Sequence, residues 1–100
     1  MNINALMQQA QKMQKEMQKK QKELEEKLFE IESAGGAIKI SIYGDRTIEK
    51  IDIDKDAIDP DDKEMLEDML MVAINDAISK IEEEASAIMG SVAGGLPGLF

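Results

Sequence analysis

The sequence predicts an α+β fold, an α-β-β-β-α protomer in which two long helices accompany a small antiparallel three-stranded sheet. Three observations predict it. Apolar residues recur at helical spacing up to about Leu28, alternate with polar residues from there to Asp54, and return to helical spacing after Asp59-Pro60. A chain of 100 residues holds one domain, which we place at residues 1–90. A glycine-rich tail follows at residues 91–100, and we expect it to be flexible.

The first helix is expected from Ile3 to about Leu28. No Gly or Pro interrupts this stretch, which is rich in the good helix formers Gln, Lys, Glu and Met. Its apolar residues recur at steps of three and four, with one gap at Lys20-Gln21, and fall within an arc of roughly 80° on a helical wheel. They are Ile3, Leu6, Ala10, Met13, Met17, Leu24 and Leu28. Four lysines occupy a similar arc roughly 180° away, so one face is apolar and the other is basic: Lys12, Lys15, Lys19 and Lys22.

Three short strands are expected between the helices. Their inward positions alternate with polar or charged residues, as in half-buried strands. These positions are Phe29, Ile31, Ile38, Ile40, Ile42, Ile51 and Ile53. Tight turns are predicted at Ala34-Gly35-Gly36 and at Gly44-Asp45. For the first strand an alternative stays open, namely that the helix continues to Ser33, because a short apolar run fits either period.

The second helix is predicted to begin at Asp59-Pro60 and to end near Met89. Asp is a good N-cap, Pro is favoured in the first turn, and Gly90 provides a stop. The apolar residues of this helix cover well over a third of its circumference, which is broader than one contact surface needs. One part can pack on the sheet while the rest meets a partner chain. The sequence therefore predicts a homodimer, which also suits a core too small to be very stable alone.

The composition argues against an enzyme and against a resident metal or cofactor. The chain has no Cys and no His, so it lacks thiol nucleophiles, imidazole bases and Cys/His metal sites. Asp52, Asp54 and Asp56 resemble the opening of an EF-hand loop. The sixth position is Ala57 instead of Gly, however, and the twelfth is Lys63 instead of Glu. We therefore expect no catalytic residues, no cofactor and no metal.

The chain is expected to be cytoplasmic. Its first residues carry no basic segment followed by a long apolar one, as a secretion signal would. The longest unbroken apolar run, Met69 to Ile74, is far too short to span a membrane. No small-molecule substrate is indicated.

Charge is distributed unevenly along the chain. The net charge is −9, which by itself argues against binding to nucleic acid. Residues 1–22, however, hold five lysines and one glutamate, a charge of +4, so residues 23–100 carry −13. Such asymmetry between segments is more informative than the total, and it directs attention to the basic face of the first helix.

In this arrangement the sequence resembles the YbaB/EbfC family of bacterial nucleoid-associated proteins. The matching stretches occur in the right order and span nearly the whole chain. They are Leu6-Met7-Gln8-Gln9-Ala10-Gln11-Lys12-Met13-Gln14, Ser33-Ala34-Gly35-Gly36, Ile51-Asp52-Ile53-Asp54, Asp62-Lys63-Glu64-Met65-Leu66-Glu67-Asp68, Ala73-Ile74-Asn75-Asp76-Ala77 and Gly94-Gly95-Leu96-Pro97-Gly98-Leu99-Phe100.

The resemblance implies an intertwined homodimer whose helices project like tweezers, DNA as the partner, and a place on the nucleoid. The family's DNA contacts lie on its projecting helices, so we carry that role only onto the lysines of the first helix: Lys12, Lys15, Lys19 and Lys22, with Lys20 at the edge of the face. The alternative is a protein–protein adaptor that docks a partner on the Met-bearing helix surface (Met7, Met13 and Met17), with DNA binding incidental.

Overall fold

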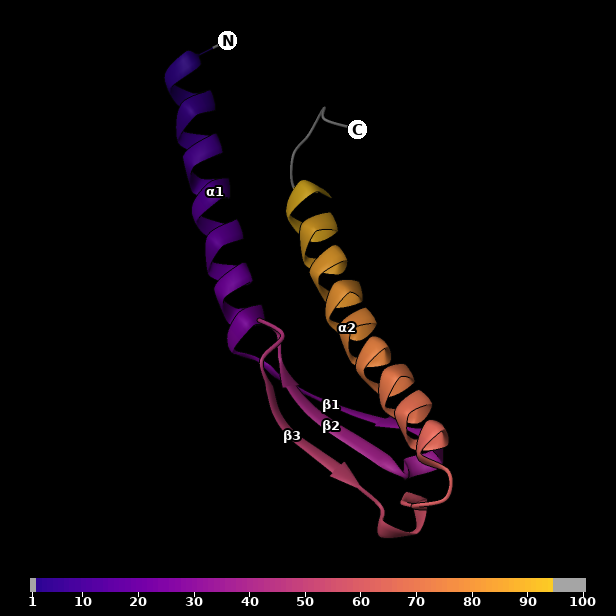
Figure 1. Ribbon diagram of the computed structural model, residues 1–100. Coiled ribbons are helices and arrows are strands. Elements are labelled where there is room, and N and C mark those ends of the chain that lie inside the picture. The colour runs from indigo at the N-terminus through magenta and orange to yellow at the C-terminus, as the bar shows by residue number, and fades with distance from the viewer. Residues whose placement is uncertain (1, 95–100) are drawn as a thin grey trace.

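A computed structural model describes the backbone of residues 2–94 and the side chains of residues 2–91. It confirms the α-β-β-β-α order and all three strands (Figure 1). The molecule is elongated, about 70 × 24 × 16 Å. The elements are α1 (Ile3–Glu26), β1 (Leu28–Ser33), the 3-10 turn η1 (Ala34–Gly36), β2 (Ile38–Tyr43), β3 (Ile48–Ile53), the 3-10 turn η2 (Lys55–Ala57) and α2 (Lys63–Gly94).

The sheet is a simple antiparallel meander with β2 in the middle. Ile31 and Ile51 both pair with Ile40, so the three isoleucines lie on one face of the sheet. A register shift between Ser41 and Ile42 brings Ile48 opposite Ile42. The opposite face carries the polar and charged partners of the same strands. One face is therefore apolar and the other is solvated, as the alternation predicts.

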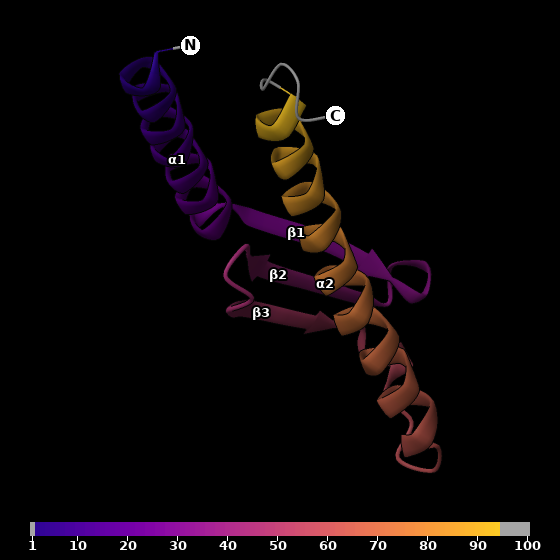
Figure 2. The ribbon, with the colours of Figure 1, turned by 90° about the horizontal axis from the view of Figure 1, so that it is seen from above.

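The core lies between this apolar face and α2. Ile38, Ile40 and Ile42 are almost completely buried, and they form one cluster with residues from α2. Ala73 and Ala77 on that helix have no exposed surface, so their small side chains let α2 approach the sheet closely. Figure 2 shows α2 crossing the sheet diagonally, and it packs on β1 and β2. The apolar face of β3 remains outside this contact.

The first helix ends at Glu26, because the backbone of Lys27 is extended and joins the sheet instead. The carbonyl of Lys27 accepts a hydrogen bond from Gly44 N–H at 2.9 Å. Gly44 lies so close to the end of α1 that a Cβ there would be 1.8 Å from the carbonyl oxygen of Leu24. The alternative of a helix continuing to Ser33 is therefore wrong, and β1 begins at Leu28.

Both predicted ends of the second helix are corrected by the structure. The helix begins at Lys63 and not at Asp59, and the Asp62 side chain accepts a hydrogen bond from Met65 N–H at 3.2 Å. Asp59 instead accepts from Asp61 N–H in the preceding turn. At the other end the helix continues through Gly90 to Gly94, so the predicted stop at Gly90 is wrong. The glycine does not break it because helical hydrogen bonding continues on both sides at a penalty of about 1 kcal/mol relative to Ala. The rest of the predicted tail, residues 95–100, lies outside the described part of the chain.

Candidate nucleic-acid interface

The distinguishing feature of the molecule is that α1 stands away from the sheet (Figure 1). Asn2 caps its free end, with the side-chain oxygen accepting from Asn4 N–H at 3.0 Å. Leu24, one turn from the sheet, is its one buried residue. Ile3, at the far end, is 71% exposed. The helix is therefore anchored at one end and solvated along most of its length.

Four of the predicted DNA-binding lysines project into solvent from one face of α1. Lys12, Lys15, Lys19 and Lys22 are all exposed. Their spacing of three and four residues places them on the side of the helix opposite Leu24, which packs into the core. The structure thus brings these four ammonium groups into one row that faces away from α2.

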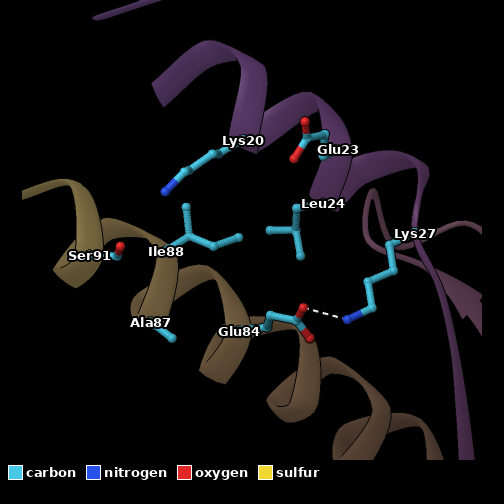
Figure 3. Close-up of a pocket in the computed structure, with 8 residues that line it drawn as sticks. All are labelled: Lys20, Glu23, Leu24, Lys27, Glu84, Ala87, Ile88 and Ser91. Atoms are coloured by element: carbon cyan, nitrogen blue, oxygen red, sulfur yellow. Dashed lines mark hydrogen bonds and ion pairs between the residues drawn. The ribbon is translucent and has the colours of Figure 1, made fainter. Parts of the chain in front are cut away.

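Lys20, the fifth predicted residue, lies on a different side. Its side chain is 34% exposed, and its Nζ lies 3.8 Å from Glu16 Oε1, one turn earlier. It lines an open cleft of about 440 Å³ between α1 and α2, where Figure 3 shows it pointing toward Ile88. At the end of the cleft nearer the sheet, Lys27 pairs with Glu84 of α2. Lys20 therefore belongs to the inter-helix cleft, whereas the other four lysines form the outer face.

The acidic residues of α2 that are ion-paired lie near the sheet end of α1. Glu84 pairs with Lys27, and Glu82 lies 3.6 Å from Arg46 in the turn after β2. Beyond Glu84, residues 85–94 of α2 carry no charged side chain, and the first acid of α1 is Glu16. The far ends of both helices are consequently free of acids apart from Glu16. This uncharged end of α2 was not predicted, although the sequence carries no charged residue after Glu84.

The EF-hand-like run of aspartates receives a structural role. Asp54, from the EF-hand-like run, accepts a hydrogen bond from Asp56 N–H at 3.0 Å and so caps η2. Across the described residues, no group of three His, Cys, Asp or Glu side chains is placed to hold a metal ion. In the same part of the chain, no helix is long and apolar enough to cross a bilayer.

Comparison with known proteins agrees with this architecture. Residues 1–96 match the model of the YbaB/EbfC DNA-binding family. A nucleoid-associated protein of Chloroflexus aurantiacus is 48% identical over the full length of both chains. Another, from Agathobacter rectalis, is 43% identical over 97% of this chain and 86% of its own.

A crystal structure of the uncharacterized Helicobacter pylori protein HP0035 shares the fold. Its TM-score is 0.76 at 24% identity, over 93% of this chain and 98% of the other. This likeness extends the agreement from sequence to backbone. The resemblance inferred from the sequence is confirmed, and the chain belongs to the YbaB/EbfC DNA-binding family.

Proposed function

We propose that this chain is a nucleoid-associated protein of the cytoplasm that binds duplex DNA as a homodimer, mainly through contacts between the lysines of α1 and DNA phosphates. The observation that carries the proposal is the exposed row of Lys12, Lys15, Lys19 and Lys22 on a helix that stands away from the acidic body. The names of the family and of the relatives support DNA as the partner. The family name denotes DNA binding, and the function that we propose includes no catalysis.

Screening explains how a chain of net charge −9 can bind a polyanion. Lys12 lies about 22 Å along the helix from Lys27, where the acids of α2 are paired. The Debye length at physiological salt is about 8 Å, so repulsion from the body is strongly reduced at the far end of α1. Two copies would contact on the order of 6–10 phosphates, which makes affinity steeply dependent on salt. Lysine–phosphate contacts carry little sequence information, so binding should tolerate most sequences.

A homodimer is supported by apolar surface that a single protomer leaves uncovered. Ile48 and Ile51 on β3 are each 39% exposed, although they share the apolar face of the sheet with the buried core. Val72 on α2 and Ile58 after η2 are each 52% exposed. Such surface is typical of an interface, and we place the dimer contact around β3 and the adjoining flank of α2.

The direct test is charge reversal on the lysine face. The triple variant Lys12→Glu, Lys15→Glu, Lys19→Glu should lose DNA affinity by about 100-fold or more, because it replaces attraction by repulsion at three phosphate contacts per protomer. Gel shift measures the affinity, and circular dichroism shows that the helices persist. A matched control reverses three exposed lysines away from α1 and β3, Lys39, Lys63 and Lys80, and changes net charge equally. If both variants lose affinity to the same degree, overall charge and not the α1 face governs binding.

The adaptor alternative is favoured by exposed methionines, with Met7 57% and Met71 56% exposed. Salt titration separates the two functions. DNA binding through phosphates should be strongest near 50 mM salt and fall steeply above it. A purified protein that binds no duplex at about 50 mM salt would exclude the proposed function and favour a protein partner on the methionine surface.

A further inference from the structure

The far half of α1 presents an apolar face that is largely uncovered by the residues whose side chains the structure describes. Ile3 and Leu6 are 71% and 45% exposed, Ala10 is exposed and Met13 is half-buried. Closer to the sheet, α2 residues Ala85, Ile88 and Met89 line a hollow together with Met17 and Leu24 of α1. The uncovered part of this face thus runs from Ala10 to the free end of α1, and the half-buried Met13 marks its boundary with the helix pair.

The sequence of this face has the form of a coiled-coil seam. Ile3, Leu6, Ala10, Met13 and Met17 follow one another at alternating steps of three and four, which are the a and d positions of a heptad. Between residues 3 and 15, the e and g positions that flank such a seam are occupied by Met7, Gln9 and Gln14. None of these is charged, so two copies could meet there without like-charge repulsion. Lys12 and Lys15 fall at c and f, on the opposite side of the helix.

We infer that residues 3–13 of α1 form a second interface between copies of this chain, in which two α1 helices from separate bodies pack antiparallel at their far ends. An overlap centred on residue 8 pairs Ile3 with Met13 and Leu6 with Ala10, so that a large side chain faces a small one at the middle. Glu16 then lies outside the overlap. The bodies stand at opposite ends of the helix pair, about 54 Å apart measured between the two Glu26 residues. This contact is therefore distinct from the proposed dimer contact at β3.

The contact is weak and depends on concentration. An overlap of eleven residues extends only about 15 Å along the helix axis. The area that it buries is therefore much smaller than the roughly 800 Å² per partner of a standard stable interface. It becomes populated where copies are crowded, as along one duplex. Because the lysine faces point away from the seam, two paired helices leave both faces open to separate phosphate backbones. That consequence, the bridging of two duplexes, depends on the proposed function, whereas the helix contact itself does not.

Cysteine cross-linking tests the contact, because the native chain has no cysteine. Leu6→Cys and Ala10→Cys protomers are mixed at high concentration without DNA and treated with a short bis-maleimide. The matched control pairs Gln8→Cys with Gln11→Cys, which lie at a similar depth on the outer side of the helix, away from the seam. We expect the Leu6/Ala10 mixture to give at least fivefold more cross-linked product than the control, and the yield should fall on dilution. Circular dichroism verifies that each variant is folded.

The cross-linking results test the contact between α1 helices independently of DNA binding. Equal yields in the two mixtures at the highest concentration would overturn it. A Leu6/Ala10 yield that stays constant on dilution to nanomolar protein would overturn it too, because it would place both helices in one tight dimer. Reversal of the α1 lysines should leave cross-linking intact, so loss of DNA binding and loss of this contact are distinguishable. Conversely, cross-linking between an Ala10→Cys protomer and an Ile3→Cys protomer should fall when the second protomer also carries Leu6→Gln. The affinity of a single dimer for DNA should change less than threefold in the same variant.

Discussion

At the scale of single residues, Gly44 determines how the projecting helix joins the sheet. The turn after β2 passes directly beneath the last turn of α1, and Gly44 N–H donates to the Lys27 carbonyl at 2.9 Å. The neighbouring Asp45 fixes the turn, because its Oδ1 accepts from Thr47 N–H at 2.8 Å, and this hydrogen bonding lowers the pKa of Asp45. The sequence predicted a turn at these residues. It could not predict the close approach to Leu24, because that contact joins elements 20 residues apart.

The substitution Gly44→Ala should destabilise the fold, because its Cβ would collide with the backbone carbonyl of Leu24. We expect a loss of about 1–3 kcal/mol in the free energy of unfolding. Gly90→Ala is the matched control. It adds the same methyl group inside α2, where nothing lies within 4 Å, and should raise stability by about 0.5–1 kcal/mol. Urea denaturation at a fixed protein concentration measures both. Equal effects at the two positions would show that the Gly44 turn is free to move.

At the scale of elements, periodicity predicted the helices and strands, whereas their boundaries were less certain. Alternating isoleucines fix which face of each strand is buried, and this information is local. The start of α2 was missed because Asp59, Asp61 and Asp62 are all suitable caps, and the choice among them depends on how the turn after η2 directs the chain. The lysine row could be predicted from the sequence because all four residues lie on one uninterrupted helix. The separate place of Lys20 depends on α2, which approaches α1 only in the folded molecule.

The corrected start of α2 gives a prediction. Asp62→Ala should lower the free energy of unfolding by about 1 kcal/mol, because the N–H of Met65 loses its side-chain acceptor at the first turn of the helix. Asp59→Ala removes the same charge three residues earlier and should change stability by less than about 0.5 kcal/mol. Thermal unfolding followed by circular dichroism compares the two. A larger effect for Asp59→Ala would restore the boundary expected from the sequence.

At the scale of the whole molecule, one protomer covers only part of its own sheet. α2 packs on β1 and β2, while Ile48 and Ile51 of β3 stay 39% exposed on the same apolar face. The sequence indicated surplus apolar surface on the second helix. That β3 would lie outside the cover of α2 could not be predicted, because the crossing direction of the helix is set by packing of Ala73 and Ala77.

Substitution on β3 tests the proposed dimer. Ile51→Lys should convert the protein to an 11.1 kDa monomer, because it buries a charge in the interface. Asp52→Lys places the same side chain on the neighbouring residue, on the opposite face of the strand, and should leave the dimer intact. Sedimentation equilibrium at micromolar concentration gives the masses. A wild-type protein that sediments as a folded monomer would contradict the dimer, as would a dimer insensitive to Ile51→Lys.

The separation of charge along the 70 Å long axis also has a kinetic consequence. With lysines toward one end and the paired and unpaired acids toward the other, the protein is a large electric dipole. Under the proposed function, the field of the DNA polyanion would exert a torque on such a dipole and turn the lysine-bearing side of α1 toward the duplex before contact. Orientation during diffusion raises the fraction of productive collisions, and the gain diminishes as added salt shortens the range of the field. Under the proposed function, the same polarity keeps the acidic sheet end away from the duplex, so that the lysine face along the side of α1 meets the DNA first.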